Sequence, residues 1–233
     1  MHKIRTKTLH QEIVAQIQEM IHKGILVKGQ KIDEKRLCES MGVSRTPVRE
    51  ALRLLKSDGL IDLIPHKGAF VSQPCIEEIN DMFEVMSVLE GTCARLAAAN
   101  MKGKDFKRIE SLHEELEEHY RNRDYEAYLK KNHVFHVFIQ ELAGNKVLND
   151  VINGLRQKIL LYRQKQLYQP ERFDQSIQEH RVLLEAFRKK YPSSAESLMK
   201  HHLLMQCKAL VGLYASKGIK GGNRRKNRKN ARS

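Results

Sequence analysis

Three histidines that lie far apart in the sequence are the residues best suited to chemistry. Apolar residues recur at three- and four-residue spacing around His136, His180 and His202, which directs each imidazole toward the core from a different helical segment. Three neutral imidazoles that converge can satisfy their buried nitrogens by coordinating one ion. One such histidine alone is more often a hydrogen-bonded core residue, but three on separate helices favour a divalent metal.

A second group with a chemical role lies at the start of another helical segment. Arg45 and Arg49 are four residues apart and therefore share one helix face. Arginine can meet O6 and N7 of guanine together, and the first turns of a recognition helix enter the major groove. Ser44 and Thr46, with the free N–H groups of the helix start, can bind phosphates. An isolated arginine pair of this kind is more often part of a solvated basic helix, so its context decides.

The context of the arginine pair is a run of three short helices and a hairpin. Hydrophobic periodicity, capping residues and glycines predict these elements. They are a helix over 9–22, a helix from the N-cap Asp33 to Met41, a helix from the cap Ser44 to Lys56, and strands over 60–63 and 69–72 around the basic tip Pro65-His66-Lys67-Gly68. This order predicts a winged helix-turn-helix over residues 1–72, followed by a linker at 73–75.

The remainder of the chain carries a helical pattern without strand signals. Six segments with apolar residues at three- and four-residue spacing are separated by glycine or proline: 76–100, 104–122, 124–142, 146–167, 173–190 and 193–215. We therefore predict a mainly α fold whose second domain, residues 76–216, is an all-α bundle of six or seven helices. Residues 217–233 are basic and almost free of apolar side chains, and we expect a disordered tail.

Composition narrows the class of partner. The chain has 42 Lys+Arg against 28 Asp+Glu, a net charge of +14, and this charge is concentrated at its two ends. Residues 217–233 alone carry eight basic and no acidic side chains, which suggests contact with a polyanion. The four cysteines include no CxxC pair, which argues against a redox motif or a cysteine zinc site. Without a long apolar run, we expect a cytoplasmic protein with no membrane partner.

A specific pattern runs from the second helix to the wing. It consists of Glu34-x-x-Leu37, the block Gly42-Val43-Ser44-Arg45-Thr46-Pro47-Val48-Arg49-Glu50-Ala51-Leu52, Leu55, Gly59-Leu60 and Gly68-x-x-Val71. This pattern resembles the GntR family of bacterial transcription regulators over about residues 8–72. The resemblance implies that Lys35, Arg45 and Arg49 read bases, that Thr46 contacts a phosphate and that His66 lies at the wing tip in the minor groove. It favours the DNA-reading role of the arginines over a solvated helix.

The helical half has weaker landmarks in a fixed order. They are Leu89-Glu90 with Ala94-Arg95-Leu96-Ala97-Ala98, then Asn132-x-x-Phe135-His136, Glu179-His180 and Met199-x-x-His202-Leu203. This half is similar to the FCD ligand-binding domain of the FadR-type branch, whose members often hold a divalent metal through one aspartate and three histidines. The resemblance implies Asn132, His136, His180 and His202 as ligands. Imidazole ligands favour zinc or nickel. The asparagine should weaken binding of the ion, because it replaces a negatively charged ligand with a neutral one.

The expected anion clamp is missing from this helical half. FCD members that bind small carboxylates commonly place an arginine four residues before the Glu90 position, where this chain has Met86. Either the effector is a different kind of molecule, or another arginine reaches the pocket. The candidates are Arg95, Arg156 and Arg163.

These observations predict a metabolite-responsive transcription regulator, specifically a repressor. One recognition helix contacts too few base pairs to single out a site in a genome, so we expect a homodimer on palindromic operator DNA. A divalent metal and a small-molecule effector, such as an organic acid, would control its DNA affinity.

Two other functions remain as alternatives. One is a metal-dependent hydrolase-like enzyme with a nucleic-acid-binding appendage. The sequence offers no acidic residue paired with the histidines to act as a general base, and an enzyme has no need of Arg45 and Arg49. The other is an RNA-binding or packaging protein led by the basic tail, which would not need a neutral bundle large enough to bind a ligand.

Overall fold

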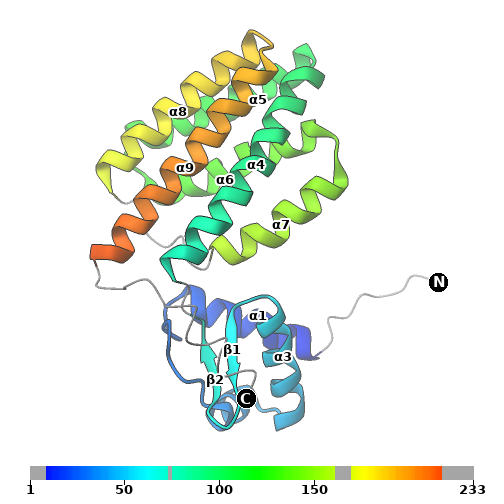
Figure 1. The fold of residues 1–233 in the computed structure, drawn as a ribbon, viewed down its shortest axis with the longest axis vertical. Helices are drawn as coiled ribbons and strands as arrows, with labels where there is room; N and C mark the ends of the chain where they lie inside the picture. Colours follow the sequence, from blue (N-terminus) through cyan, green and yellow to red (C-terminus); the bar gives the residue numbers. More distant parts are fainter. Residues whose placement is uncertain (1–8, 73–74, 161–168, 217–233) are drawn as a thin grey trace, which may run out of the picture. The chain divides into compact units, whose positions relative to one another are not determined.

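The structure is a computed structural model that describes residues 9–72, 75–160 and 169–216 (Figure 1). Two compact units make up the chain, Met1–Pro74 and Cys75–Ser233. The predicted fold class is confirmed, since a winged helix-turn-helix with one small sheet is followed by an all-α bundle. Residues 73–74 of the predicted linker, Arg163 and the predicted tail 217–233 lie outside the described residues.

The N-terminal unit packs three helices and a hairpin around one core. Its elements are α1 (Leu9–His22), α2 (Glu34–Met41), α3 (Arg45–Ser57), β1 (Ile61–Ile64) and β2 (Gly68–Val71). The strands pair antiparallel. As expected, the Asp33 carboxylate caps α2 by accepting from the N–H groups of Lys35 and Arg36. Val48 and Leu52 of α3 are almost fully buried, whereas Arg45 and Arg49 of the same helix are exposed.

Both strands are displaced by one residue from the predicted ranges. β1 begins at Ile61 instead of Leu60, because the Leu60 N–H binds the Leu55 carbonyl and closes the end of α3. β2 begins at Gly68, which pairs with Ile64. Backbone hydrogen bonds determine where the two strands begin, and the alternation of apolar and polar side chains does not predict these bonds.

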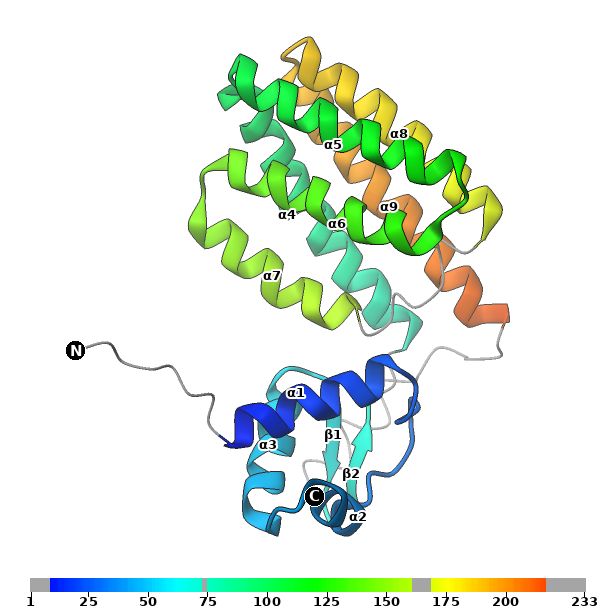
Figure 2. The same cartoon turned by 180° about the vertical axis from the view of Figure 1, so that it is seen from behind.

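The second unit is a bundle of six helices within the described residues. They are α4 (Ile76–Asn100), α5 (Gly103–Arg121), α6 (Tyr125–Ala143), α7 (Lys146–Leu160), α8 (Pro170–Arg188) and α9 (Pro192–Ser216). The long helix α4 lies between α9 and α7 in both views (Figures 1 and 2). It also packs on α6, while α5 packs on α6 and α8. The predicted extension of α7 to residue 167 lies outside the described residues.

Three helices of the bundle begin on residues that the sequence placed between helices. These are Gly103 in α5, Pro170 in α8 and Pro192 in α9. Proline is suited to the first helical position, where its missing N–H would have no acceptor and its fixed φ already fits the helix. Pro170 and Pro192 therefore mark helix starts. The predicted starts at residues 173 and 193 were three residues and one residue too late.

A close approach of α4 and α9 depends on Gly91. A Cβ atom at this position would lie 2.8 Å from Lys200 Cγ and 3.2 Å from the Glu196 carbonyl oxygen. The absence of a side chain allows the two longest helices to pack backbone against backbone. Among the described helices, none is long and apolar enough to cross a membrane.

Candidate metal centre and nucleic-acid interface

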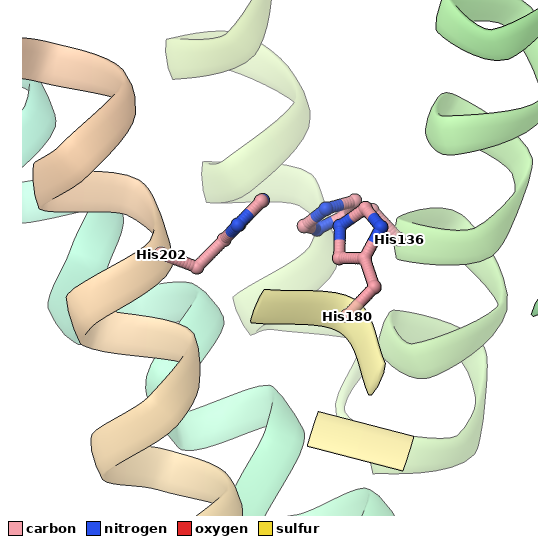
Figure 3. A group of neighbouring side chains, drawn as sticks. All are labelled: His136, His180 and His202. Atoms are coloured by element: carbon pink, nitrogen blue, oxygen red, sulfur yellow. The ribbon is translucent and has the colours of Figure 1, made fainter. Parts of the chain in front are cut away.

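The three histidines converge in the core of the bundle. His136 comes from α6, His180 from α8 and His202 from α9, and their rings turn toward one another (Figure 3). One nitrogen from each ring lies within 4.8 Å of the others, and all three residues are buried. Three nitrogens bound to one tetrahedral zinc ion are about 3.3 Å apart. Small side-chain rotations would therefore bring the group to metal-binding distances.

Each imidazole is held through its Nδ1 atom. Nδ1 of His136 lies 2.8 Å from Glu90 Oε2, and Nδ1 of His202 lies 2.6 Å from Glu179 Oε2. Nδ1 of His180 lies 3.4 Å from the hydroxyl of Tyr128. A carboxylate can only accept hydrogen bonds, so Nδ1 is the protonated nitrogen of His136 and His202. In the neutral rings the lone pair is then on Nε2.

The pairing of Glu90 and Glu179 with the histidines was not predicted, since the sequence offered no acidic residue paired with them to act as a general base. Both belong to the quoted landmarks, yet their role was missed. Glu90 is 4% exposed, and burial raises its pKa, but His136 and Arg156 outweigh burial and hold the pKa well below its ordinary value. A signal was present, because Glu90 falls at a core position of α4 between Phe83 and Ala94, and a buried acid needs a partner.

Unpartnered buried atoms show that the group fits a metal ion. His136 Nε2, His180 Nε2 and Asn132 Oδ1 are buried without a hydrogen-bond partner among the described residues. Such atoms are uncommon in a folded core because each one loses its hydration without compensation. An ion bound to both Nε2 atoms would remove this cost. Asn132 is 4% exposed on α6, one turn before His136, which suits its predicted place as a weak fourth ligand.

The protonation state of His180 also suits coordination. Burial, with the neighbouring His202 and His136, lowers the pKa of His180 well below its ordinary value, so the ring stays neutral. His202 Nε2 lies 2.5 Å from the side-chain nitrogen of Gln206, which donates to it. An ion at this nitrogen requires the Gln206 amide to turn away.

The three arginines proposed for the effector have different surroundings. Arg156 is 5% exposed and binds Glu90 at 2.8 Å and Gln140 at 3.2 Å, so it adjoins the histidine group through Glu90. Arg95 is exposed on α4 and pairs with Glu196, and its place in the effector pocket stays a prediction. Arg163 lies outside the described residues.

A basic hollow marks the expected DNA surface of the N-terminal unit. Four of the six predicted DNA-binding residues line a hollow of about 610 Å³ between α2, α3 and the wing: Lys35, Arg45, Arg49 and His66. Lys31 and Lys67 also line it, and no role was predicted for Lys31 from the sequence. Lys31 forms an isolated bridge with Phe70 of β2, which explains its position beside the wing.

The start of α3 leaves backbone donors exposed. Ser44 occupies the N-cap position as predicted, but its side chain accepts no capping hydrogen bond from the described backbone. The third helical residue is Pro47, which has no N–H and so removes one of the two usual capping donors. Ser44 and Thr46 are exposed at this helix start, outside the group of described residues that line the hollow.

Arg49 is held by an acidic neighbour. Its Nε atom donates to Glu34 Oε2 at 3.0 Å, while 62% of the side chain remains exposed. The two terminal nitrogens are therefore available to a base edge. The sequence pattern included Glu34 but gave no reason for it, and the ion pair with Arg49 supplies one.

Comparison with known proteins places both units in described families. Residues 9–71 match the bacterial regulatory proteins of the gntR family, and residues 81–204 match the FCD domain. The chain is 27% identical over 218 residues to the Glc operon transcriptional activator of Escherichia coli K12, covering 82% of this chain and 85% of that protein. It is 27% identical over 183 residues to a probable D-xylose utilization operon transcriptional repressor of Paenarthrobacter nicotinovorans, covering 78% and 80%.

A solved structure supports the same fold. E. coli McbR/YncC superimposes with a TM-score of 0.69 at 22% identity, covering 90% of this chain and all of that one. These matches are to transcriptional regulators and not to enzymes, so the hydrolase alternative is set aside. The chain belongs to the GntR family of bacterial regulatory proteins, in the group that carries an FCD domain, and it is a DNA-binding transcriptional regulator.

Proposed function

We propose that this regulator binds palindromic operator DNA as a homodimer, and that a divalent metal and a small-molecule effector in the FCD domain control its affinity. The observation that carries the proposal is the buried group of His136, His180 and His202, which unites three helices at one point. Lys35, Arg45 and Arg49 would read bases, Ser44 and Thr46 would hold phosphates, and His66 would lie in the minor groove. The protein would act in the cytoplasm.

Zinc or nickel is the ion that this donor set suits best, because both accept imidazole nitrogen. His136, His180 and His202 would hold the ion, and Asn132 would offer an amide oxygen. The ion would supply a Lewis-acidic position for a ligand atom of the effector. The protein's own side chains provide the donors, exclude water and keep Nδ1 protonated on His136 and His202.

Charge balance favours an anionic effector such as an organic acid. Glu90 is paired with Arg156, and Glu179 with Arg172, so these four buried or partly buried charges cancel. The ligand side chains are neutral, including Asn132 where family members have an aspartate. A divalent ion would therefore leave positive charge in a low-dielectric core, which an anionic group on the effector would balance. That the protein represses remains a prediction, since its relatives include an activator and a repressor.

Selection of bound fragments from a random DNA library would test the DNA-binding part. We expect two inverted half-sites about one helical turn apart. Elemental analysis of the purified protein would test the metal, and the selected operator could then be titrated with and without a chelator. Enrichment of no sequence would contradict the operator-binding role, and protein that contains and takes up no ion would contradict the metal centre.

A further inference from the structure

Two of the three histidines are backed by a chain of buried charges. Behind His136 lies Glu90, whose second oxygen accepts from Arg156 Nη2 at 2.8 Å. Glu179 contacts Nδ1 of His202 and accepts two hydrogen bonds, of 2.8 and 2.6 Å, from Arg172. Both arginines are buried, at 5% and 2% exposure. The bundle thus contains two arginine–glutamate–histidine chains that end at one point.

The hydrogen bonds of each carboxylate decide what it can do. Glu90 uses Oε1 for Arg156 and Oε2 for His136. Glu179 uses Oε1 for Arg172, and its Oε2 is shared between Arg172 and His202. Both carboxylates lie on the Nδ1 side of the rings, away from the Nε2 atoms that would bind the ion. They can fix the rotation of the two rings and keep the lone pair on Nε2.

We propose that Glu90 and Glu179 are positioning residues of the metal centre, and that Arg156 and Arg172 keep these carboxylates in place. This inference rests on the proposed metal site and concerns side chains that do not touch the ion. Carboxylates that orient metal-bound imidazoles raise ligand basicity and hold the ring in a productive orientation. His180 is placed differently, by the neutral hydroxyl of Tyr128, which itself donates to Ser176.

The two chains connect different parts of the bundle. Glu179 and Arg172 both lie on α8, so this chain joins only α8 to His202 of α9. Glu90 lies on α4 and Arg156 on α7, and they join these two helices to His136 of α6. Rotation of His136 on metal binding would therefore be felt by α4, the helix that follows the DNA-binding unit in the chain.

Competition between full-length metal-free protein and a chelating indicator for zinc would test the proposal. Glu90→Leu and Glu179→Leu should each weaken zinc binding about 10- to 100-fold, as loss of such partners does at other sites. Glu90→Gln should restore part of the affinity, because an amide oxygen can still accept from Nδ1. Glu110→Gln is the matched control, since Glu110 pairs with Arg188 on the bundle surface and should leave zinc affinity unchanged.

A paired substitution separates positioning from a purely structural role. Glu90→Leu alone leaves Arg156 buried without its counter-ion, whereas Glu90→Leu with Arg156→Met removes both charges. Without metal, the double variant should melt at about the temperature of the metal-free wild-type protein. Its zinc affinity should stay as weak as that of Glu90→Leu. Its cobalt-loaded form should also show an altered visible absorption spectrum, because the His136 ring is no longer held.

Three outcomes would overturn the inference, and they are distinguishable. If wild-type protein takes up zinc and the two leucine variants bind it equally tightly, the carboxylates do not position the ligands, although the metal centre stands. The same holds if affinity returns with stability in the double variant. If wild-type protein takes up no ion, the metal centre itself fails and this inference fails with it.

Discussion

Replacement of Arg49 by alanine tests whether α3 reads bases. The Nε atom of Arg49 is occupied by Glu34 at 3.0 Å, so both terminal nitrogens can face a guanine edge as a bidentate pair. Each such pair discriminates by about 1–3 kcal/mol. A dimer has two copies, so Arg49→Ala should cost about 2–6 kcal/mol on the operator, or about 30-fold to 20,000-fold. Because the side chain is exposed, its loss should change folding stability by less than about 1 kcal/mol.

Fluorescence anisotropy at one fixed salt concentration would measure binding to the selected operator and to a scrambled duplex. Lys56→Ala removes an equal charge from the exposed surface of the same helix and should weaken both duplexes similarly. Glu34→Ala should reduce the preference for the operator, because Arg49 is no longer held in position. It should also strengthen binding to the scrambled duplex, because it removes a negative charge. If Arg49→Ala weakens both duplexes equally, Arg49 is a phosphate contact and the reasoning is refuted.

Three further measurements concern the bundle and the oligomer. Asn132→Asp should tighten zinc binding because it adds a negative charge at a buried, unpartnered position; unchanged affinity in a chelator competition would remove Asn132 from the ligand set. Metal-free protein should lose stability as the pH falls below 6.5. Burial lowers the folded-state pKa of His113, a buried residue of α5, and of His180 below 6.5, so the unfolded chain then binds more protons. Urea midpoints at several pH values would show this loss, and His113→Phe should flatten it; a pH-independent midpoint would contradict it. Sedimentation should give a dimer at micromolar concentration with and without DNA, and a stable monomer in both would be incompatible with the proposed operator complex.

Helix positions were predictable because apolar spacing reports which side of a segment is buried. The predicted segment 76–100 coincides with α4, Ile76–Asn100. Apolar periodicity says less about the first and last residues of a helix or strand, because backbone hydrogen bonds determine those positions. The displacement of β1 illustrates this, since the N–H of Leu60 is used to close α3.

The spacing of buried residues along a helix also indicates which arginine can lie near the histidine group. Buried positions of α4 include Glu90, Ala94 and Ala97, and Arg95 falls outside this spacing. Arg156 instead lies between the buried residues Ile152 and Ile159 of α7. The same count applied to the sequence would have separated these two candidates.

Partner choice could not be predicted in this way. The periodicity of a helix fixes the face of a side chain but not its height relative to residues on other helices. Glu90 and Arg156 are 66 positions apart and meet only because α7 packs beside α4. Arg172, by contrast, finds Glu179 two turns along the same helix. Only the second pairing follows from local spacing.

The pairing of these charges bears on how the site could respond to a signal. Each buried carboxylate already has an arginine, and the pKa of Glu90 is held well below its ordinary value, so it stays ionised at physiological pH. Burial keeps His180 neutral over the same range. Because neither Glu90 nor His180 changes charge near neutral pH, these two groups do not alter the charge of their surroundings by titrating, whereas an ion or an anionic effector that enters or leaves would alter it.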